Sequence, residues 1–326
     1  MGPFSKGLWV PQPARRQQTG GLEQAKYLIL FPFFRLLVLL AGLPASPARF
    51  FAAMDLDAYF ARIGYDGSPS VNEDTLAALH AAHLLSVPYE NLDIQLGQAK
   101  PLAETSFESR IVGQNRGGWC YEMNGLFSCA LRQIGFEVDR LGGAVFREHM
   151  GDDTIGNHMV LTVHLDGRKL VADVGLGDGP LYPFPLEERE WEENGFTFGL
   201  GPIEDDYWRF KNHEHGLAGS FDFQETARNL SWYAGQCEAL QSGDESVFVQ
   251  LAMTFRRDEY RMRALRELTY LEIEGTKKEE RRISTFEEYK DVLVPLIDFE
   301  LGDDLERLFG HVHARVAKRE REAAEH

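Results

Sequence analysis

The sequence predicts an α+β protein in which helices come first, antiparallel strands follow, and helices return at the end. Three observations support this order. Apolar residues recur at helical spacing up to about residue 135, alternate with polar ones from 137, and return to helical spacing after 285. The 326 residues are enough for a sizeable core and for two or three compact units.

Three segments in the first part predict helices. Residues 55–63 carry apolar side chains at helical spacing, and 72–85 begin with acidic residues that suit a helix start. The third helix is expected from Cys120 to Ile134, after the glycine pair at 117–118, and Gly135 should end it.

Strands are expected over 137–147, 158–165 and 168–174. The dipeptide Asp166-Gly167 between the last two is a strong signal for a two-residue hairpin turn. Further strands are expected near 208–210, 219–224, 247–255 and 267–274, followed by helices over 285–298 and 303–318.

Composition excludes several classes of protein. Hydrophobic residues make up 44% and charged residues 26%, which argues against wholesale disorder, collagen and a polytopic membrane protein. The formal net charge of -17 would repel a phosphate backbone, so no nucleic-acid partner is expected. The sequence contains no Walker loop, no GxGxxG and no HExxH.

Residues 1–53 differ from the rest, with six basic residues and one acidic residue. The apolar run 27–43 has 17 residues, with Pro32 and Arg35 inside it. It allows three interpretations: a membrane anchor, a signal peptide, or translated upstream sequence with the true start at Met54. We favour the last because the composition changes abruptly there, and we expect no stable membrane association.

The three cysteines are Cys120, Cys129 and Cys237. An odd, sparse set without a CxxC pair predicts neither a disulfide framework nor a structural zinc site, and it favours a reducing, cytoplasmic location. Cys120 stands at the predicted start of a helix, where free N–H groups and the helix dipole would lower a thiol pKa. The alternative for Cys120 is a small buried apolar side chain. Cys129 should face the opposite side, toward the core, and Cys237 carries no signal.

Hairpin arithmetic places a histidine beside an aspartate. With 166 and 167 as the turn, facing residues sum to 333, so Asp173 faces Val160. His158 shares a face with Val160, which makes it a diagonal neighbour of Asp173 at about 7–8 Å between backbones. A carboxylate that orients an imidazole is what a thiol nucleophile requires of its base. Each residue alone has a plainer interpretation, His158 as a hydrogen-bonded strand residue and Asp173 as a strand-end cap.

The other histidines are weaker candidates. His80 and His83 are expected on a helix face and His164 on a strand. Four more are expected at the surface: His213, His215, His311 and His313.

Four stretches resemble the arylamine N-acetyltransferase family: YFARIGYDG (59–67), VPYENLD (87–93), RGGWCYEMN (116–124) and DVGLG (173–177). The order Cys120, His158, Asp173 resembles the catalytic triad of that family. The resemblance runs from about Asp57 to Gly179 and is carried by highly specific motifs.

The resemblance implies a helical domain (54–136) with the nucleophile, a β-barrel domain (137–250) with His158 and Asp173, and an α/β lid (251–326). The triad would be arranged as in thiol-protease-like folds. It further implies a supporting ion pair between Glu90 and Arg116, with surface charge as the alternative for both residues.

The family's cleft loop corresponds to Gly175, Leu176 and Gly177. It more often reads DVGFG, so Leu176 replaces an aromatic residue that would line the acceptor pocket.

The implied activity is transfer of an acetyl group from acetyl-CoA to Cys120, and then to a small aromatic amine or hydrazine, without a metal. Three alternatives remain open: an amide synthase that moves a longer acyl chain, a thiol hydrolase, and a non-enzymatic protein of the same fold.

Overall fold

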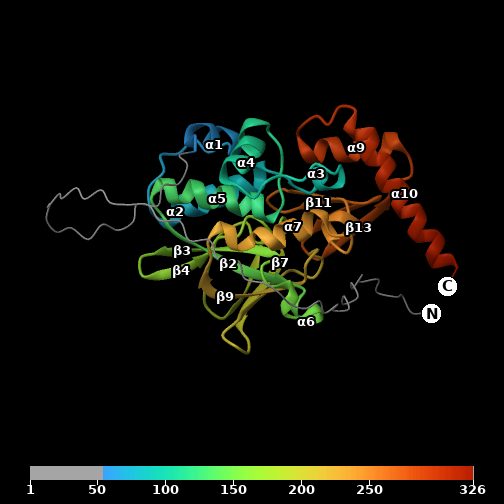
Figure 1. Ribbon diagram of the computed structural model, residues 1–326. Coiled ribbons are helices and arrows are strands. Elements are labelled where there is room, and N and C mark those ends of the chain that lie inside the picture. The colour runs from blue at the N-terminus through green and yellow to red at the C-terminus, as the bar shows by residue number, and fades with distance from the viewer. Residues whose placement is uncertain (1–53, 326) are drawn as a thin grey trace, which may run out of the picture. The chain divides into compact units, whose positions relative to one another are not determined.

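The computed structural model describes residues 54–325, which form one compact unit (Figure 1). The predictions made for residues 1–53 lie outside the described residues. Within 54–325, no helix has both the length and the apolar character needed to cross a membrane.

The helices of the described chain lie mainly toward its two ends. They are α1 (Leu56–Ile63), α2 (Glu73–Ser86), α3 (Leu92–Gln95), α4 (Glu104–Glu108), α5 (Cys120–Ile134), α6 (Arg147–Met150), α7 (Ala234–Ser242), α8 (Val247–Gln250), α9 (Phe286–Ile297) and α10 (Asp304–Ala324). Three further helical turns are the π-helix η1 (Ser109–Gly113) and the 3₁₀ turns η2 (Asp152–Thr154) and η3 (Leu230–Tyr233).

The strands form two antiparallel sheets. The eight-stranded sheet contains β2 (Glu137–Val145), β3 (His158–Leu165), β4 (Arg168–Val171), β5 (Phe184–Pro185), β6 (Arg189–Glu193), β7 (Phe196–Pro202), β8 (Trp208–Lys211) and β9 (Ser220–Ala227). The five-stranded sheet contains β1 (Tyr89–Glu90), β10 (Met253–Arg257), β11 (Met262–Arg266), β12 (Thr269–Glu274) and β13 (Lys277–Arg282).

Helix α5 is the central element of the first part, and its bounds are those predicted from the sequence. Nearly all of its residues are buried, because it packs against α4 on one side and against β2 and β3 on another. Gly135 ends the helix with φ of 118°, a backbone conformation that favours glycine. The helix that carries Cys120 is therefore fixed on several sides.

The eight-stranded sheet curls without closing its hydrogen-bond ladder. Its strand order is β5-β4-β3-β2-β9-β8-β7-β6, so β5 and β6 are the two ends. Phe184 on β5 nevertheless packs against Trp191 on β6, with ring centroids 4.7 Å apart. The predicted barrel is thus a curled sheet whose two ends meet through side chains.

The predicted hairpin between β3 and β4 is confirmed. Its register pairs Leu165 with Arg168 and Thr162 with Val171. Asp166 and Gly167 both have positive φ, 51° and 75°, as a type I′ turn requires. Both faces of β3 are buried, so the histidine-bearing face lies inside the protein as well.

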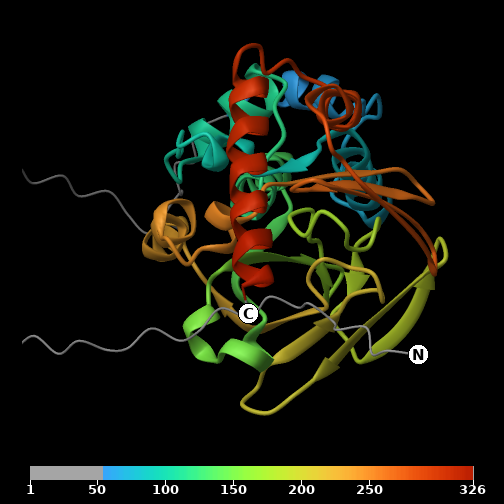
Figure 2. The same ribbon diagram turned by 90° about the vertical axis from the view of Figure 1, so that its right-hand side faces the viewer.

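The five-stranded sheet and the last two helices form a second core. Apolar residues of β11, α9 and α10 pack together, among them Leu265, Leu293 and Leu308. Figure 2 shows α10 in red in front of these strands. One prediction here was partly wrong: the run 247–255 begins with the short helix α8, and β10 starts only at Met253. The proposed domain boundaries at 136 and 250 stay a prediction.

His213 corrects another prediction, because it is buried rather than at the surface. Only 4% of it is exposed, and its ring packs against Phe196 and Phe198. Burial, together with the positive charge of Arg257, lowers the pKa of His213 to about 4. His311 and His313 are exposed, as predicted.

The hairpin turn yields a stability prediction. Gly167→Ala should lower the free energy of unfolding by about 1–2 kcal/mol, because an L side chain is strained at positive φ. Urea denaturation measures the change. Gly219→Ala is the matched control, since that glycine is exposed and its added Cβ would meet nothing within 4 Å. Equal losses in the two variants would contradict the prediction.

Candidate active site

Cys120 is the first residue of α5, and only 2% of it is exposed. The residue before it, Trp119, donates its backbone N–H to Glu122 Oε2 at 3.3 Å, which fixes the start of the helix. The Cys120 sulfur lies 3.8 Å from the backbone carbonyl oxygen of Asn157. The backbone N–H of Met159 is also directed at the sulfur. The thiol therefore contacts the two residues that flank His158.

His158 and Asp173 meet as the hairpin arithmetic predicted. His158 Nε2 lies 2.6 Å from Asp173 Oδ2, and both side chains are buried. Burial alone would raise the pKa of Asp173. The positive charge and hydrogen bond of His158, with hydrogen bonds from Asn124 and the Gly175 N–H, instead hold that pKa below its usual value. Asp173 is thus a carboxylate that accepts several hydrogen bonds.

Asn124 is a residue whose role sequence reasoning missed. Its Nδ2 donates to Asp173 Oδ1 and to the Met159 carbonyl, each at 2.6 Å, and its Oδ1 accepts from the Val174 N–H at 2.9 Å. One amide therefore joins α5, β3 and the segment after β4. A signal was present, because Asn124 lies four residues after Cys120 and so shares its face of the helix.

The pKa of Cys120 corrects a further prediction. Burial raises the pKa of the thiol well above its usual value, and the negative charge of Asp173 adds to the rise. The backbone N–H groups of Tyr121 and Met159 act in the opposite direction but do not outweigh burial. The expectation that the helix start alone lowers this pKa was therefore wrong, and a nearby positive charge is needed to form the thiolate.

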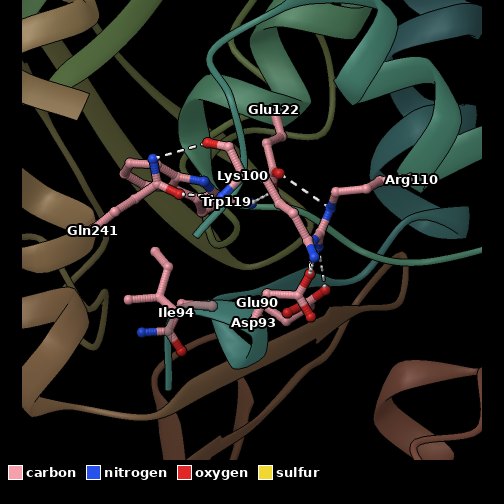
Figure 3. Close-up of a pocket in the computed structure, with 9 residues that line it drawn as sticks. Glu90, Asp93, Ile94, Lys100, Arg110, Trp119, Glu122 and Gln241 are labelled. Atoms are coloured by element: carbon pink, nitrogen blue, oxygen red, sulfur yellow. Dashed lines mark hydrogen bonds and ion pairs between the residues drawn. The ribbon is translucent and has the colours of Figure 1, made fainter. Parts of the chain in front are cut away.

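The predicted ion pair of Glu90 and Arg116 is part of a larger buried cluster. Figure 3 shows Glu90, Asp93, Arg110 and Glu122 of this cluster. Arg116 Nη2 is 3.9 Å from Glu90 Oε1, but only 2.7 Å from Asp93 Oδ1. Glu90 has a closer partner in Arg110, whose Nη2 is 3.1 Å from Glu90 Oε1. Arg110 also pairs with Asp93. The sequence did not indicate the contact between Arg110 and Asp93, because the two residues are 17 positions apart and lie in separate elements.

Glu122 links this cluster to the helix that bears the thiol. Its Oε1 lies 3.1 Å from Arg110 Nε, and its Oε2 accepts from the Trp119 N–H. Arg110 stays charged among three carboxylates. Burial raises the pKa of Glu122 to about 7, although the charge of Arg110 opposes the rise. Glu122 is therefore a titratable group two residues from Cys120.

The predicted cleft loop follows Asp173 and approaches α5 closely. A Cβ on Gly175 would lie 2.8 Å from the Cys120 carbonyl oxygen, so no larger residue fits there without movement. Gly177 has φ of +83° and lies against the ring of Tyr89. Leu176 between them is half-buried.

The other two cysteines are buried and unpaired. Cys129 lies 3.5 Å from Arg140 Nη2, and Cys237 accepts a hydrogen bond from Gln241 at 3.2 Å. Cys129 thus belongs to the core, as predicted. Among residues 54–325, no group of three or more His, Cys, Asp and Glu side chains is placed to hold a metal ion.

Asn124 gives the first prediction for this site. Asn124→Ala should lower the free energy of unfolding by about 3 kcal/mol, because buried polar groups on β3 and at Val174 lose their partner. Chemical denaturation measures the loss. Asn229→Ala removes an exposed helix cap and should cost only about 1 kcal/mol. A loss at Asn124 no larger than at Asn229 would contradict the prediction.

Glu122 gives a pH prediction. From pH 4.5 to 7 the unfolded chain releases a proton that the folded protein keeps, so rising pH lowers the free energy of unfolding. The pKa difference corresponds to about 3 kcal/mol, and the loss ends near pH 7. The glutamine of Glu122→Gln cannot ionise. Between pH 4.5 and 7 the free energy of unfolding of this variant should therefore rise by about 3 kcal/mol relative to that of wild type.

Denaturation curves at several pH values measure that difference. Glu238→Gln, at an exposed position of α7, is the matched control. If the free energy of unfolding of Glu122→Gln changes with pH in the same way as that of wild type, Glu122 does not titrate in this range.

Comparison with known proteins identifies the family. The N-acetyltransferase family model matches residues 73–305. The curated arylamine N-acetyltransferase of Mycolicibacterium smegmatis is 47% identical over 144 residues, which cover 41% of this chain and 51% of that protein. The matches to curated relatives span about half the length of those relatives.

The similarity to solved structures covers a larger share of this chain than the similarity to the curated relatives. The Nocardia farcinica arylamine N-acetyltransferase has a TM-score of 0.72 and 31% identity, over 79% of this chain and 94% of that one. The Mycobacterium marinum arylamine N-acetyltransferase, solved in complex with CoA, has a TM-score of 0.70 over 81% of this chain and 99% of that one. Its 24% identity supports the fold alone. This chain therefore belongs to the arylamine N-acetyltransferase family.

Proposed function

We propose that this protein transfers an acetyl group from acetyl-CoA to an aromatic amine or hydrazine, in two steps through an acetylated Cys120. The observation that carries the proposal is the buried His158–Asp173 pair, whose Nε2 and Oδ2 atoms are 2.6 Å apart, with the Cys120 sulfur against the backbone next to His158. A nucleophile, a base and a group that orients the base are the parts that acyl transfer needs.

The geometry favours one ring nitrogen of His158 as the base. Nε2 faces Asp173, so an Nε2–H donated to that carboxylate leaves the lone pair on Nδ1. Nδ1 then accepts the thiol proton from Cys120, and Asp173 stabilises the resulting imidazolium. Because burial opposes a lone thiolate, the positive ring supplies the charge that stabilises the sulfur.

In the first step the Cys120 sulfur bonds to the carbonyl carbon of the acetyl thioester. The bond from that carbon to the CoA sulfur breaks, and His158 returns its proton to the departing CoA. In the second step the amine nitrogen bonds to the carbonyl carbon, the bond to Cys120 breaks, and one amine proton passes through His158 to the sulfur. Nothing is oxidised or reduced.

The surrounding residues have positioning roles in this proposal. The cluster of Glu90, Asp93, Arg110 and Arg116 holds the segment that leads into α5, and Glu122 ties that cluster to the start of the helix. Leu176, half-buried in the loop after Asp173, would contact the acceptor amine.

Acetyl-CoA as the donor is supported by membership of the N-acetyltransferase family, which the family model and the Nocardia farcinica structure show. The three unpaired cysteines support a reducing, cytoplasmic location.

Intact-mass spectrometry tests the proposal. Mixing the protein with acetyl-CoA should add one acetyl group, and adding aniline should remove it and yield acetanilide. Cys120→Ala should show no adduct while keeping its fold, whereas Cys129→Ala is the matched control that should still be acetylated. Loss of the adduct without aniline would indicate a hydrolase, and no adduct at all would overturn the proposal.

Asp173 gives a separate prediction. Asp173→Asn should slow acetylation by about 10³–10⁴-fold, because the amide no longer holds His158 in the tautomer that accepts the thiol proton. Stopped-flow detection of released CoA measures the rate, and circular dichroism should show an unchanged fold. A rate within tenfold of wild type would remove Asp173 from the mechanism.

A further inference from the structure

Asp178 is a buried carboxylate that the triad does not use. It lies in the loop between β4 and β5 and is only 1% exposed. Its Oδ1 accepts from Asn212 Nδ2 at 2.9 Å, and its Oδ2 accepts from the Leu217 N–H at 2.6 Å. Both donors belong to the loop between β8 and β9. Asp178 thus joins two loops that are far apart in the sequence.

The loop that contains Asp178 is anchored at both of its ends. Asp173 at its start is bound to His158 and Asn124. Leu181 at its end offers its carbonyl oxygen to His80 Nδ1 at 2.9 Å. The Leu181 N–H donates to Glu193. Asp178 is therefore the side chain that holds the middle of this loop, two residues after Leu176.

We infer that Asp178 is a positioning residue for the acceptor amine, because it holds Leu176 in place by clamping the 174–179 loop to the loop between β8 and β9. This inference rests on the proposed acetyl transfer and extends it to the selection of the acceptor. Asp178 touches no reacting group and acts through the position of Leu176.

The electrostatics explain how a carboxylate can occupy this position. Burial raises the pKa of Asp178 to about 6, while the Leu217 N–H, the Asn212 amide and the charge of Arg257 oppose the rise. The group is therefore mostly ionised at neutral pH. Arg257 is itself buried, and its other carboxylate neighbour is Glu193, 3.5 Å away. A buried carboxylate accepts stronger hydrogen bonds than an amide would, so it makes a firmer clamp.

Close backbone packing makes the loop sensitive to this clamp. On one side Gly175 lies against the Cys120 carbonyl oxygen, and Gly177 lies against the Tyr89 ring. Gly179 packs under Leu176, since a Cβ there would be 3.3 Å from the Leu176 side chain. A shift of the loop away from the β8–β9 connection would therefore move Leu176 while Asp173 stays bound to His158.

The test separates the two half-reactions. Acetylation by acetyl-CoA is followed by CoA release, and the acetylated protein is then mixed with aniline over a range of concentrations. Asp178→Asn should raise the aniline concentration for half-maximal transfer about tenfold, because small misplacements weaken productive binding. Its acetylation rate should stay within twofold of wild type.

Two further variants keep the test decisive. Asn212→Ala removes one donor to Asp178 and should shift aniline saturation in the same direction, even if Asp178→Asn folds poorly. Asp206→Asn, on an exposed turn, is the matched control and should behave as wild type. Unchanged aniline saturation in both clamp variants, or an equal loss in both half-reactions, would overturn the inference. Absence of an acetyl adduct in wild type would instead overturn the proposed function itself.

Discussion

The buried hydrogen bond between His158 and Asp173 is the interaction on which the proposed chemistry depends. Its two partners come from the hairpin of β3 and β4, and Asn124 of α5 binds the same carboxylate. A single amide thus sets the helix that carries the thiol against the strand that carries the imidazole. Because all of these groups are buried, each one left without its partner would be costly.

The cluster of Glu90, Asp93, Arg110 and Arg116 balances charge where several backbone segments meet before α5. The segments from β1 to α5 approach each other closely, as the bridge between Tyr89 and Gly118 shows. Arg110 and Arg116 neutralise the acidic side chains that meet there. Buried ion pairs contribute little net stability, but breaking one is expensive. The cluster therefore fixes the register of these segments more than it adds to the free energy of unfolding.

Sequence alone predicted the features that depend on local rules. The span of α5, the Asp166-Gly167 turn and the meeting of His158 with Asp173 all follow from helical period, turn chemistry and strand pairing. Features that depend on distant segments were missed. The partners of Glu90, the burial of His213 and the raised pKa of Cys120 arise only when separate elements pack together. The sequence also did not reveal the order of strands β5 to β8, because that order depends on how separate segments pair.

The join between β5 and β6 has a mechanical consequence. Phe184 and Trp191 meet there through their rings, while the backbone ladder stops at each edge. Separating these edges breaks no main-chain hydrogen bond between them, so it costs less than parting any paired neighbours in the sheet. The join between β5 and β6 is therefore the part of this sheet that side-chain packing alone holds closed.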